Sequence, residues 1–377
     1  MTSCRAVKPE TLAAKVMHSI DHTTGAVVPP IHLATTYARD EQYALRGTMM
    51  YTRDENPGTV PVEQLLTALE GGAASLAFAS GMAAATAAFR ASCKPGDHII
   101  GPRFGYFAVR NWLSRFTKWG VHVDFVDASN LDELRAALRP TTKLVWIESP
   151  ANPTWQIADI SAAAELAHSV GARLAIDSTA ASPVHVRPIA LGADLVMHSA
   201  TKYLAGHSDV LAGALVTAAE DDVWAELKEL RHDEGPVLAP FEAYLLQRGM
   251  RTLFARVERS SATAMALATA LETLPGVMVI YPGLPSHPQH AIAQRQYTRG
   301  FGSMLSIRVG SRERALDVVK RVRVWLPATS LGGVESLIEH RASVEGASSP
   351  TPVDLLRLSV GLEHVDDLLR DLREALS

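Results

Sequence analysis

Short apolar segments alternate with helical segments between residues 62 and 202, and this alternation restricts the fold more than any other feature of the sequence. Strands are expected at Ser75–Ala79, His98–Gly101, Val121–Val126, Lys143–Ile147, Arg173–Ile176 and Asp194–Met197. Helices are expected at Val62–Glu70, after Met82, at Asn130–Leu138 and at Ser161–Val170. This alternation is typical of a mostly parallel central sheet covered by helices on both faces, so the predicted fold class is α/β.

Changes in this pattern divide the 377 residues into three expected parts. Residues 1–60 show little periodicity, and we expect an extended N-terminal arm that lies on another subunit. Residues 61–245 are expected to form a large domain, and residues 246–377 a smaller C-terminal α+β domain with a linking helix. The elements expected near and after the second boundary are a long helical stretch at roughly Pro240–Leu274 and strands at Met304–Val309 and Leu356–Val360.

Composition and charge exclude several classes of protein. Charged residues make up 20% of the chain and the net charge is -4, which gives no electrostatic reason to expect nucleic acid or an anionic membrane as a partner. The two cysteines, Cys4 and Cys93, are too few for a disulfide framework and show no metal-ligand spacing. Met1–Lys8 lacks the apolar core of a signal peptide, and the apolar stretch Met82–Phe89 is too short to span a bilayer. We therefore expect a cytoplasmic protein without a bound metal.

Polar residues follow three of the predicted strands, at the edge of the sheet where ligands of parallel sheets bind. Gly81 opens a helix after the first strand, and backbone N–H groups at such a position attract an anion. Asp177 follows another strand, and a run that contains Ser199, Thr201 and Lys202 follows a third. Pyridoxal 5′-phosphate (PLP) needs such a set: an amine for its aldehyde, a carboxylate for its ring nitrogen, and donors for its phosphate.

Each of these residues has an ordinary structural explanation when it is taken alone. Asp177 could be a helix N-cap, Lys202 a surface lysine, and Gly81 a simple turn former. Ser199 and Thr201 could be ordinary caps. The sequence favours a PLP site because all of them fall at strand ends of one sheet, in the order phosphate turn, aspartate, lysine.

A resemblance to a known family is carried by Thr35-Thr36-Tyr37, Tyr51-Thr52-Arg53 with Asn56-Pro57, Leu69-Glu70-Gly71-Gly72, Ala79-Ser80-Gly81-Met82, Glu148-Ser149-Pro150 with Asn152-Pro153, Ser199-Ala200-Thr201-Lys202-Tyr203, Gly206-His207-Ser208-Asp209, Tyr281-Pro282-Gly283-Leu284, the segment 330–337, and Arg357-Leu358-Ser359-Val360-Gly361. Together these segments resemble the Cys/Met-metabolism PLP enzymes, the cystathionine γ-synthase-like group of PLP fold type I. The resemblance covers nearly the whole chain, and the combination of segments is highly specific.

The resemblance implies roles for the residues that surround the cofactor. Lys202 would hold PLP as a Schiff base and later move the protons of the substrate, while Asp177 would pair with the pyridinium nitrogen. Tyr106 would stack on the face of the ring and assist proton transfer. The residues expected to hold the phosphate are Gly81, Met82, Ser199 and Thr201.

The resemblance also implies residues for the substrate and for a second subunit. Arg357 would clamp the α-carboxylate of a small amino-acid substrate, for which a guanidinium fork is suited, and Asn152 and Ser330 would assist beside it. Tyr51 and Arg53 would reach the phosphate of the neighbouring subunit. The protein is therefore expected to be a homodimer or homotetramer with shared active sites.

The resemblance implies replacement or elimination at the β or γ carbon of a sulfur- or oxygen-substituted amino acid. A cystathionine γ-synthase-like reaction is favoured by the segment 330–337, and cystathionine or methionine γ-lyase-like elimination is the alternative. A non-catalytic, regulatory PLP-binding protein is the alternative from another class, but every catalytic position is filled. Aminotransferase chemistry is disfavoured by the trans-sulfuration-type segments.

The sequence departs from the family pattern at three places. Ser178 follows the aspartate where asparagine is usual. Phe107 and Ala108 follow Tyr106 where two small residues are usual, and Asn111, with Arg110 beside it, stands where an arginine is usual. Thr329 stands where cystathionine-handling members carry glutamate. Because Asn111 and Thr329 carry no charge, we expect cystathionine to be a poor substrate or product.

Overall fold

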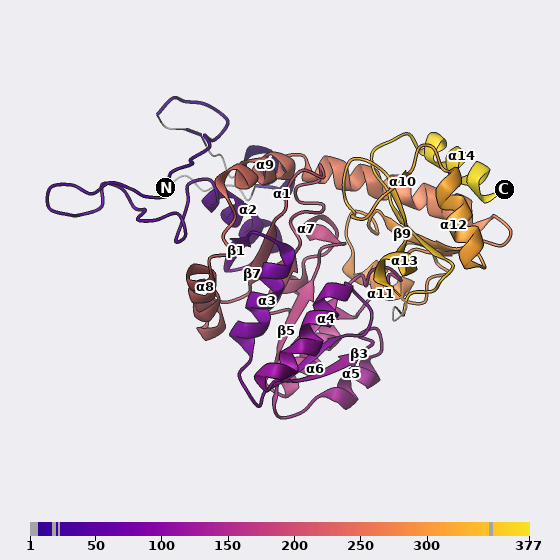
Figure 1. The fold of residues 1–377 in the computed structure, drawn as a ribbon, viewed down its shortest axis with the longest axis horizontal. Helices are drawn as coiled ribbons and strands as arrows, with labels where there is room; N and C mark the ends of the chain where they lie inside the picture. Colours follow the sequence, from indigo (N-terminus) through magenta and orange to yellow (C-terminus); the bar gives the residue numbers. More distant parts are fainter. Residues whose placement is uncertain (1–6, 17–19, 22, 347–349) are drawn as a thin grey trace.

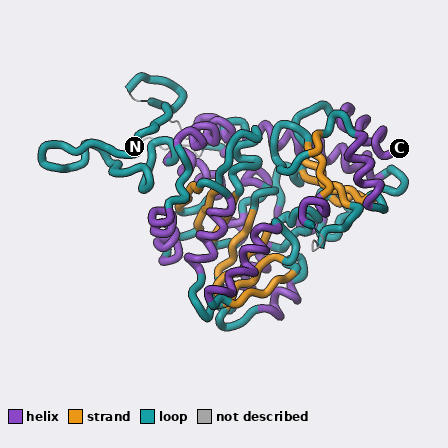
Figure 2. Tube along the Cα trace, viewed as in Figure 1, coloured by secondary structure: helices purple, strands orange, loops and turns teal. Residues whose placement is uncertain are grey.

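The computed structural model describes residues 7–16, 20–21, 23–346 and 350–377, so Cys4 lies outside the described residues. Figure 1 shows an N-terminal arm that extends away from the body, a sheet flanked by helices, and a second layered unit near the C-terminus. Figure 2 shows the strands gathered in two separate groups. Within the described part of the chain, no helix has the length and apolar character needed to cross a bilayer.

The first group of strands forms a sheet in the order β1-β7-β6-β5-β4-β2-β3, here called the large sheet. Its strands are β1 (Ala74–Phe78), β2 (His98–Pro102), β3 (His122–Val126), β4 (Thr142–Glu148), β5 (Arg173–Asp177), β6 (Leu195–His198) and β7 (Gly213–Thr217). Of these, β7 runs antiparallel to its neighbours β1 and β6, and all the other pairs are parallel. The predicted mostly parallel sheet is therefore confirmed, although β7 was not expected from the sequence.

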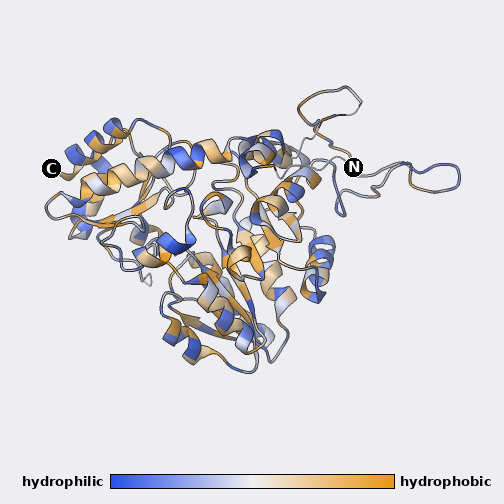
Figure 3. Ribbon diagram, turned by 180° about the vertical axis from the view of Figure 1, so that it is seen from behind, coloured by the Kyte–Doolittle hydropathy of each residue, from blue (hydrophilic) through white to orange (hydrophobic). Residues whose placement is uncertain are grey.

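Helices cover both faces of the large sheet. They are α2 (Val60–Glu70), α3 (Gly81–Ser92), α4 (Phe107–Phe116), α5 (Leu131–Ala137), α6 (Ile160–Ser169), α7 (Ser182–His185) and α8 (Asp222–Glu234), with 3-10 turns at Thr117–Trp119 and Pro188–Leu191. Successive residues of one strand face opposite sides: Trp146 packs in the core under α3, α4 and α8, whereas Val145 packs in the core under α5 and α6. Both layers of helices are needed because the strands are apolar on both faces, which Figure 3 shows as hydrophobic colour on the central strands.

The second group of strands forms the small sheet, in the order β10-β11-β12-β9-β8. Its strands are β8 (Met278–Ile280), β9 (Met304–Arg308), β10 (Leu326–Pro327), β11 (Leu337–His340) and β12 (Leu355–Ser359). The helices of this region are α11 (His290–Gln296), α12 (Arg312–Arg321), α13 (Arg341–Glu345) and α14 (Val365–Leu376). This mostly antiparallel sheet with its helices has the α+β character expected of the C-terminal part, while the boundaries at residues 60 and 245 stay predictions.

The helical stretch expected at roughly Pro240–Leu274 is present, but it is divided into two helices. It consists of α9 (Pro240–Met250) and α10 (Leu253–Glu272), and α10 runs from α9 toward the C-terminal elements in Figure 1. Thr252 leaves the α-helical backbone region, and its N–H bonds to the carbonyl of Gly249. The same carbonyl accepts a hydrogen bond of 2.8 Å from the buried guanidinium of Arg256, which stabilises the break.

The N-terminal arm is not extended throughout, which corrects the expectation of an extended arm. Its first described element is α1 (Pro9–Lys15), a short helix with a buried Ala13 that packs in the same core as α2 and α10. From about residue 23 onward the arm has no regular element before α2. Large apolar side chains of this segment are exposed to solvent: Val27 is 74% exposed, Leu33 71% and Tyr43 77%. A surface of this kind is normally covered in a stable protein.

Candidate active site

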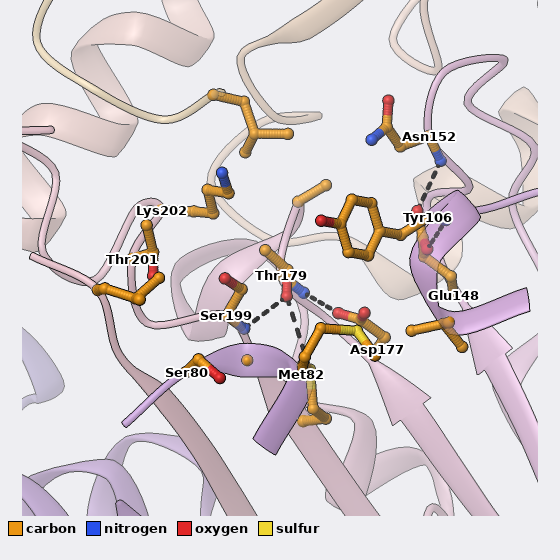
Figure 4. A pocket seen from close by; sticks show the side chains of 16 residues that line it. Ser80, Met82, Tyr106, Glu148, Asn152, Asp177, Thr179, Ser199, Thr201 and Lys202 are labelled. Carbon is orange, nitrogen blue, oxygen red and sulfur yellow. Dashed lines mark hydrogen bonds between the residues drawn. The ribbon is translucent and has the colours of Figure 1, made fainter. Parts of the chain in front are cut away.

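A cavity of about 180 Å³ opens at the carboxyl ends of the strands of the large sheet (Figure 4). Its lining residues are Ser80, Gly81, Met82, Tyr106, Val109, Glu148, Asn152, Asp177, Thr179, Ala180, Met197, Ser199, Thr201, Lys202, Leu211 and Leu331. The structure thus brings together eight of the residues singled out from the sequence: Gly81, Met82, Tyr106, Asn152, Asp177, Ser199, Thr201 and Lys202. In Figure 4, Lys202 and Tyr106 point into the cavity from opposite sides.

One end of the cavity is formed by the start of α3. Ser80 caps this helix, because its Oγ accepts a hydrogen bond of 3.1 Å from the N–H of Ala83. A side chain at Gly81 would place a Cβ only 2.9 Å from the Cβ of Ser199, so glycine is required for α3 to approach the end of β6 this closely. The N–H groups at the start of α3 and the hydroxyl of Ser199 therefore face one small space, which suits an anion.

The carboxylate of Asp177 lies at the floor of the cavity, where β5 ends. Its Oδ1 accepts a 3.0 Å hydrogen bond from the N–H of Thr179, and burial raises the pKa of Asp177. The hydroxyl of Thr179 in turn accepts the N–H of Ser199 at 2.8 Å, which ties the end of β5 to the end of β6. The N-cap explanation for Asp177 was wrong, since the next helix starts at Ser182. A cation placed in the cavity would offset the cost of burying this carboxylate.

Lys202 follows β6 and is not a surface lysine. Its Nζ donates a 2.9 Å hydrogen bond to the Oγ of Ser330, a residue of the loop between β10 and β11. Burial, followed by the positive charges of Arg357 and Arg341, lowers the pKa of Lys202 to about 8. A lowered pKa leaves a larger share of the amine unprotonated near neutral pH, which is the state that attacks a carbonyl carbon.

Glu148 is a residue of the cavity to which the sequence analysis gave no role. Its Oε2 accepts the N–H of Tyr106 at 2.6 Å and its Oε1 accepts the N–H of Asn152 at 2.8 Å. Burial, followed by the negative charge of Asp177, raises the pKa of Glu148 to about 8. Glu148 therefore fixes the backbone of two residues that were predicted to contact the ring and the substrate. The available signal was its position, because it directly follows the strand predicted to end at Ile147.

The side of the site toward the small sheet, here called its second wall, has Leu331 in the cavity lining, while Ser330 and Arg357 lie outside that lining. Arg357 on β12 is 3% exposed, and its guanidinium donates to the Oδ1 of Asn152 at 3.2 Å and to the carbonyl of Ser330 at 2.7 Å. Arg357 thus contacts both of the other residues expected at the substrate, although Asn152 is 205 positions away in the chain. Ser330 has a φ of 115°, a strained backbone conformation of the kind that is concentrated at functional sites. Glu339 also contacts Arg357, at 2.7 Å, and was not expected from the sequence.

Tyr51 and Arg53 are not brought to this cavity within the single chain. Both belong to the part of the chain before α2, and neither is in the lining of the cavity. Tyr51 pairs with Thr36 in an isolated bridge and is 41% exposed. The guanidinium carbon of Arg53 lies 5.6 Å from the centre of the Tyr51 ring, so the two side chains contact each other.

The positions that depart from the family pattern lie around the cavity, not in its lining. Asn111 is exposed on α4, and the neighbouring Arg110 donates to the carbonyl of Arg103 at 2.9 Å. Thr329 lines a second hollow of about 520 Å³, which shares Thr201 and Leu211 with the first cavity and also includes Ser330, the hydrogen-bond partner of Lys202. Any distal recognition by Thr329 would therefore take place in this second hollow.

Comparison with known proteins gives the same assignment over the whole chain. Residues 10–377 match the family of Cys/Met metabolism PLP-dependent enzymes. The chain belongs to this family. It is similar to the cystathionine gamma-synthase of Mycobacterium tuberculosis, with 46% identity over 98% of this chain and 96% of the relative, and to the cystathionine gamma-lyase of Dictyostelium discoideum, with 41% identity over 97% of both. The solved structure of metB from Corynebacterium glutamicum superimposes with a TM-score of 0.95 at 40% identity over 98% of both chains. The protein is thus a PLP-dependent enzyme.

The residues of the cavity fit this cofactor. The start of α3, held tight against Ser199 by Gly81, provides donors for a phosphate. Asp177 provides a buried carboxylate that a ring cation would stabilise, and Lys202 provides an amine with a lowered pKa. These three groups lie at three different places around one cavity, as a ligand with a phosphate, a ring nitrogen and an aldehyde requires.

Proposed function

We propose that this enzyme catalyses replacement at the γ carbon of an oxygen- or sulfur-substituted amino acid, in the manner of a cystathionine γ-synthase. The observation that carries the proposal is that Ser330 binds both key side chains. Its hydroxyl accepts a hydrogen bond from the Lys202 amine at 2.9 Å, and its carbonyl accepts one from Arg357. A proton-carrying amine and a carboxylate-binding guanidinium are thereby held at one substrate-sized space. The identity of 46% to a cystathionine gamma-synthase supports the choice of reaction.

The cofactor, when bound, supplies an electron sink that stabilises negative charge at the substrate carbons. The chain supplies the rest. Asp177 keeps the ring nitrogen protonated, and Gly81, Met82, Ser199 and Thr201 hold the phosphate. Tyr106, whose backbone is fixed by Glu148, covers the face of the ring. The presence of each of these residues in the lining of the cavity supports the role proposed for it.

Lys202 moves the protons of the substrate, and Arg357 sets the direction from which they are taken. Arg357 binds the α-carboxylate with its planar fork, and Asn152 and Ser330 keep that fork in place. The α-proton is then presented to the Lys202 amine, whose lowered pKa suits it to act both as base and as acid near neutral pH.

A second copy of the chain completes the site in this proposal. The exposed apolar side chains of the arm, among them Leu33 and Tyr43, need a cover, and an identical subunit can provide it. Tyr51 and Arg53 would then reach the phosphate in the partner's cavity, in a homodimer or homotetramer located in the cytoplasm. An equal mixture of Arg53→Ala and Lys202→Ala protein should recover up to roughly a quarter of wild-type activity, because about half of the dimers are hybrids and each hybrid has one intact site of two. Hybrids that form and stay inactive would count against the shared site.

The reaction is tested by a panel of O-acylhomoserines, cystathionine, homocysteine and methionine, with products followed by mass spectrometry and 2-oxo acid release measured in parallel. We expect a thioether product from an O-acylhomoserine and a thiol, with little 2-oxo acid. Release of a 2-oxo acid and ammonia as the main outcome would instead establish the γ-lyase alternative, which the 41% identity to a cystathionine gamma-lyase supports. No turnover of any amino acid by PLP-loaded protein would favour the non-catalytic alternative.

A further inference from the structure

A buried row of alternating charges leads away from Arg357 into the small sheet. Glu339 on β11 lies directly opposite Arg357 on β12, and their charged atoms are 2.7 Å apart. Glu339 also accepts a hydrogen bond of 3.2 Å from Arg341, which in turn donates to Glu345 at 2.8 Å. These four side chains are at most 5% exposed, so water does little to screen their charges.

Arg341 also reaches the other wall of the cavity. Its guanidinium carbon lies 5.4 Å from the centre of the Phe107 ring, and that ring lies 5.2 Å from the ring of Tyr106. Contacts of a guanidinium with an aromatic face are favourable, more so when both groups are shielded from water. Phe107 is one of the positions where the sequence departs from its family, and the structure shows that this departure provides a partner for Arg341.

The row is not built for stability alone. Among the described residues, the buried Oε1 of Glu339 and the buried Nη2 of Arg341 have no hydrogen-bond partner. Unpartnered buried polar atoms are costly, and buried ion networks can often be replaced by apolar side chains without loss of stability. A network that keeps such atoms next to a substrate-binding residue calls for a functional explanation.

The order of the charges along this row supplies that explanation. Glu339 alone would make a neutral pair with Arg357, and an arriving carboxylate would meet a guanidinium whose charge is already balanced. Arg341 shares the same Oε2 of Glu339 and so draws part of its negative charge away from Arg357. Glu345 balances Arg341, so the four side chains carry no net charge, but without Arg341 the row would have two carboxylates and one guanidinium. The field of this group reaches the cavity, since Arg357 and Arg341 lower the pKa of Lys202 while Glu339 raises it.

We propose that Arg341 is a positioning residue that shares Glu339 with Arg357 and thereby leaves the charge of Arg357 only partly balanced, so that Arg357 attracts the α-carboxylate of the substrate. This inference rests on the proposed function only for the role of Arg357. It does not depend on the leaving group or on whether replacement or elimination follows.

The test compares two unreactive probes on the PLP-loaded enzyme. L-Norvaline has an α-carboxylate, and L-norvalinamide has a neutral amide in its place; their dissociation constants are read from the change in visible absorbance of the cofactor. Wild type should bind norvaline more tightly. In Arg341→Met this preference should fall about tenfold or more, because Glu339 would then balance the charge of Arg357 and weaken its charged hydrogen bond to the carboxylate of norvaline. Adding Glu339→Gln to Arg341→Met should restore the preference, because glutamine does not neutralise Arg357.

Arg308→Met is the matched control. Arg308 lies on β9 of the same sheet and pairs with Asp354 at 2.9 Å, but it is 41% exposed and does not contact Arg357. Its loss should leave the preference unchanged. Thermal unfolding and the absorbance of the bound cofactor report whether each variant folds. If Arg341→Met does not fold, Glu339→Gln alone should still raise the preference for norvaline, and a fall would overturn the inference.

The outcomes separate this inference from the proposed function. Equal weakening of both probes in Arg341→Met, with the preference unchanged, would show a structural role only and overturn the inference. A wild-type enzyme without any preference for norvaline would instead show that the role proposed for Arg357 is wrong. A preference that is present in wild type and fully retained in Arg341→Met leaves the role of Arg357 intact and refutes the role of Arg341.

Discussion

The two walls of the cavity are held together by different forces. On the wall of the large sheet, polar groups stand at the ends of adjacent parallel strands and are fixed by nearby backbone, as when Asp177 accepts the N–H of Thr179. On the wall of the small sheet, Arg357 is fixed by charged and polar groups from distant parts of the chain, such as Glu339 and Asn152. The positions of the side chains in the first wall are therefore determined by the order of the strands, whereas those in the second wall are determined by buried charge pairs.

This difference predicts how each wall responds to mutation. A wall held by backbone hydrogen bonds keeps its shape when one side chain is changed, so variants there should lose chemistry and keep the fold. A wall held by charge pairs leaves an uncompensated buried charge when one partner is removed, and such losses are expensive. Variants there should affect both binding and stability.

The largest effect is expected for Lys202→Ala, on the wall of the large sheet. Loss of the amine removes the proton carrier, so kcat should fall at least about 10²- to 10⁴-fold. The fold should persist, because the backbone bonds around residue 202 do not involve the amine. Borohydride reduction followed by peptide mapping should place the cofactor on Lys202 in wild type. Label on another lysine would refute the assignment.

Arg357→Lys should have the next largest effect, on the charged wall. Lysine keeps the charge but cannot reproduce the planar fork that donates both to Asn152 and to Ser330. We expect KM to rise about 10- to 100-fold, the cost of one or two charged hydrogen bonds, and the melting temperature to fall. A variant with unchanged KM for every amino-acid substrate would show that the α-carboxylate binds elsewhere.

The wall of the large sheet could largely be predicted from the sequence, because each of its polar residues is marked by the residues next to it in the chain. Each strand is an apolar run that ends at a polar residue, and parallel strands bring those ends to one edge. For this reason Asp177 and Lys202 were found from strand ends alone. β7 was missed because it runs antiparallel and carries no polar residue into the cavity.

The wall of the small sheet could not be predicted in the same way. Arg357 was found only by resemblance to a family, and Glu339 and Arg341 were not found at all. Their partnership depends on the register between β11 and β12, which places Glu339 opposite Arg357. No spacing along the chain gives that register, since residues 341–354 separate the two strands. Glu148 was missed although it directly follows a predicted strand, because its carboxylate binds backbone N–H groups and is not one of the groups that PLP itself needs.

Glu148 offers a pH-dependent test of the wall of the large sheet. Its pKa is raised by burial and by Asp177, from 4.5 to about 8 in the folded state. Between those values the folded protein holds a proton that the unfolded chain releases, so stability falls as the pH rises. The slope for one proton is at most about 1.4 kcal/mol per pH unit. In cofactor-free protein, Glu148→Gln should flatten the decline in melting temperature between about pH 5 and pH 8. An unchanged slope would show that Glu148 is ionised in the fold.

The smallest effect is expected where the second hollow meets the charged wall, at Thr329. A substrate such as cystathionine carries a distal ammonium group, which a carboxylate binds better than a hydroxyl does, since a charge-assisted hydrogen bond is roughly twice as strong as a neutral one. Thr329→Glu should therefore raise kcat/KM for cystathionine about three- to tenfold.

The same change should leave kcat/KM for a short-chain homoserine ester nearly unaltered, because that substrate has no distal ammonium group to reach the hollow that Thr329 lines with Glu335 and Leu337. Thr329→Gln is the matched control: it has nearly the same length as glutamate but no charge, and it should give no gain. If the wild-type enzyme already handles cystathionine best and Thr329→Glu brings no improvement, the second hollow does not bind the distal part of the substrate. Specificity would then be set entirely by the two walls around Lys202.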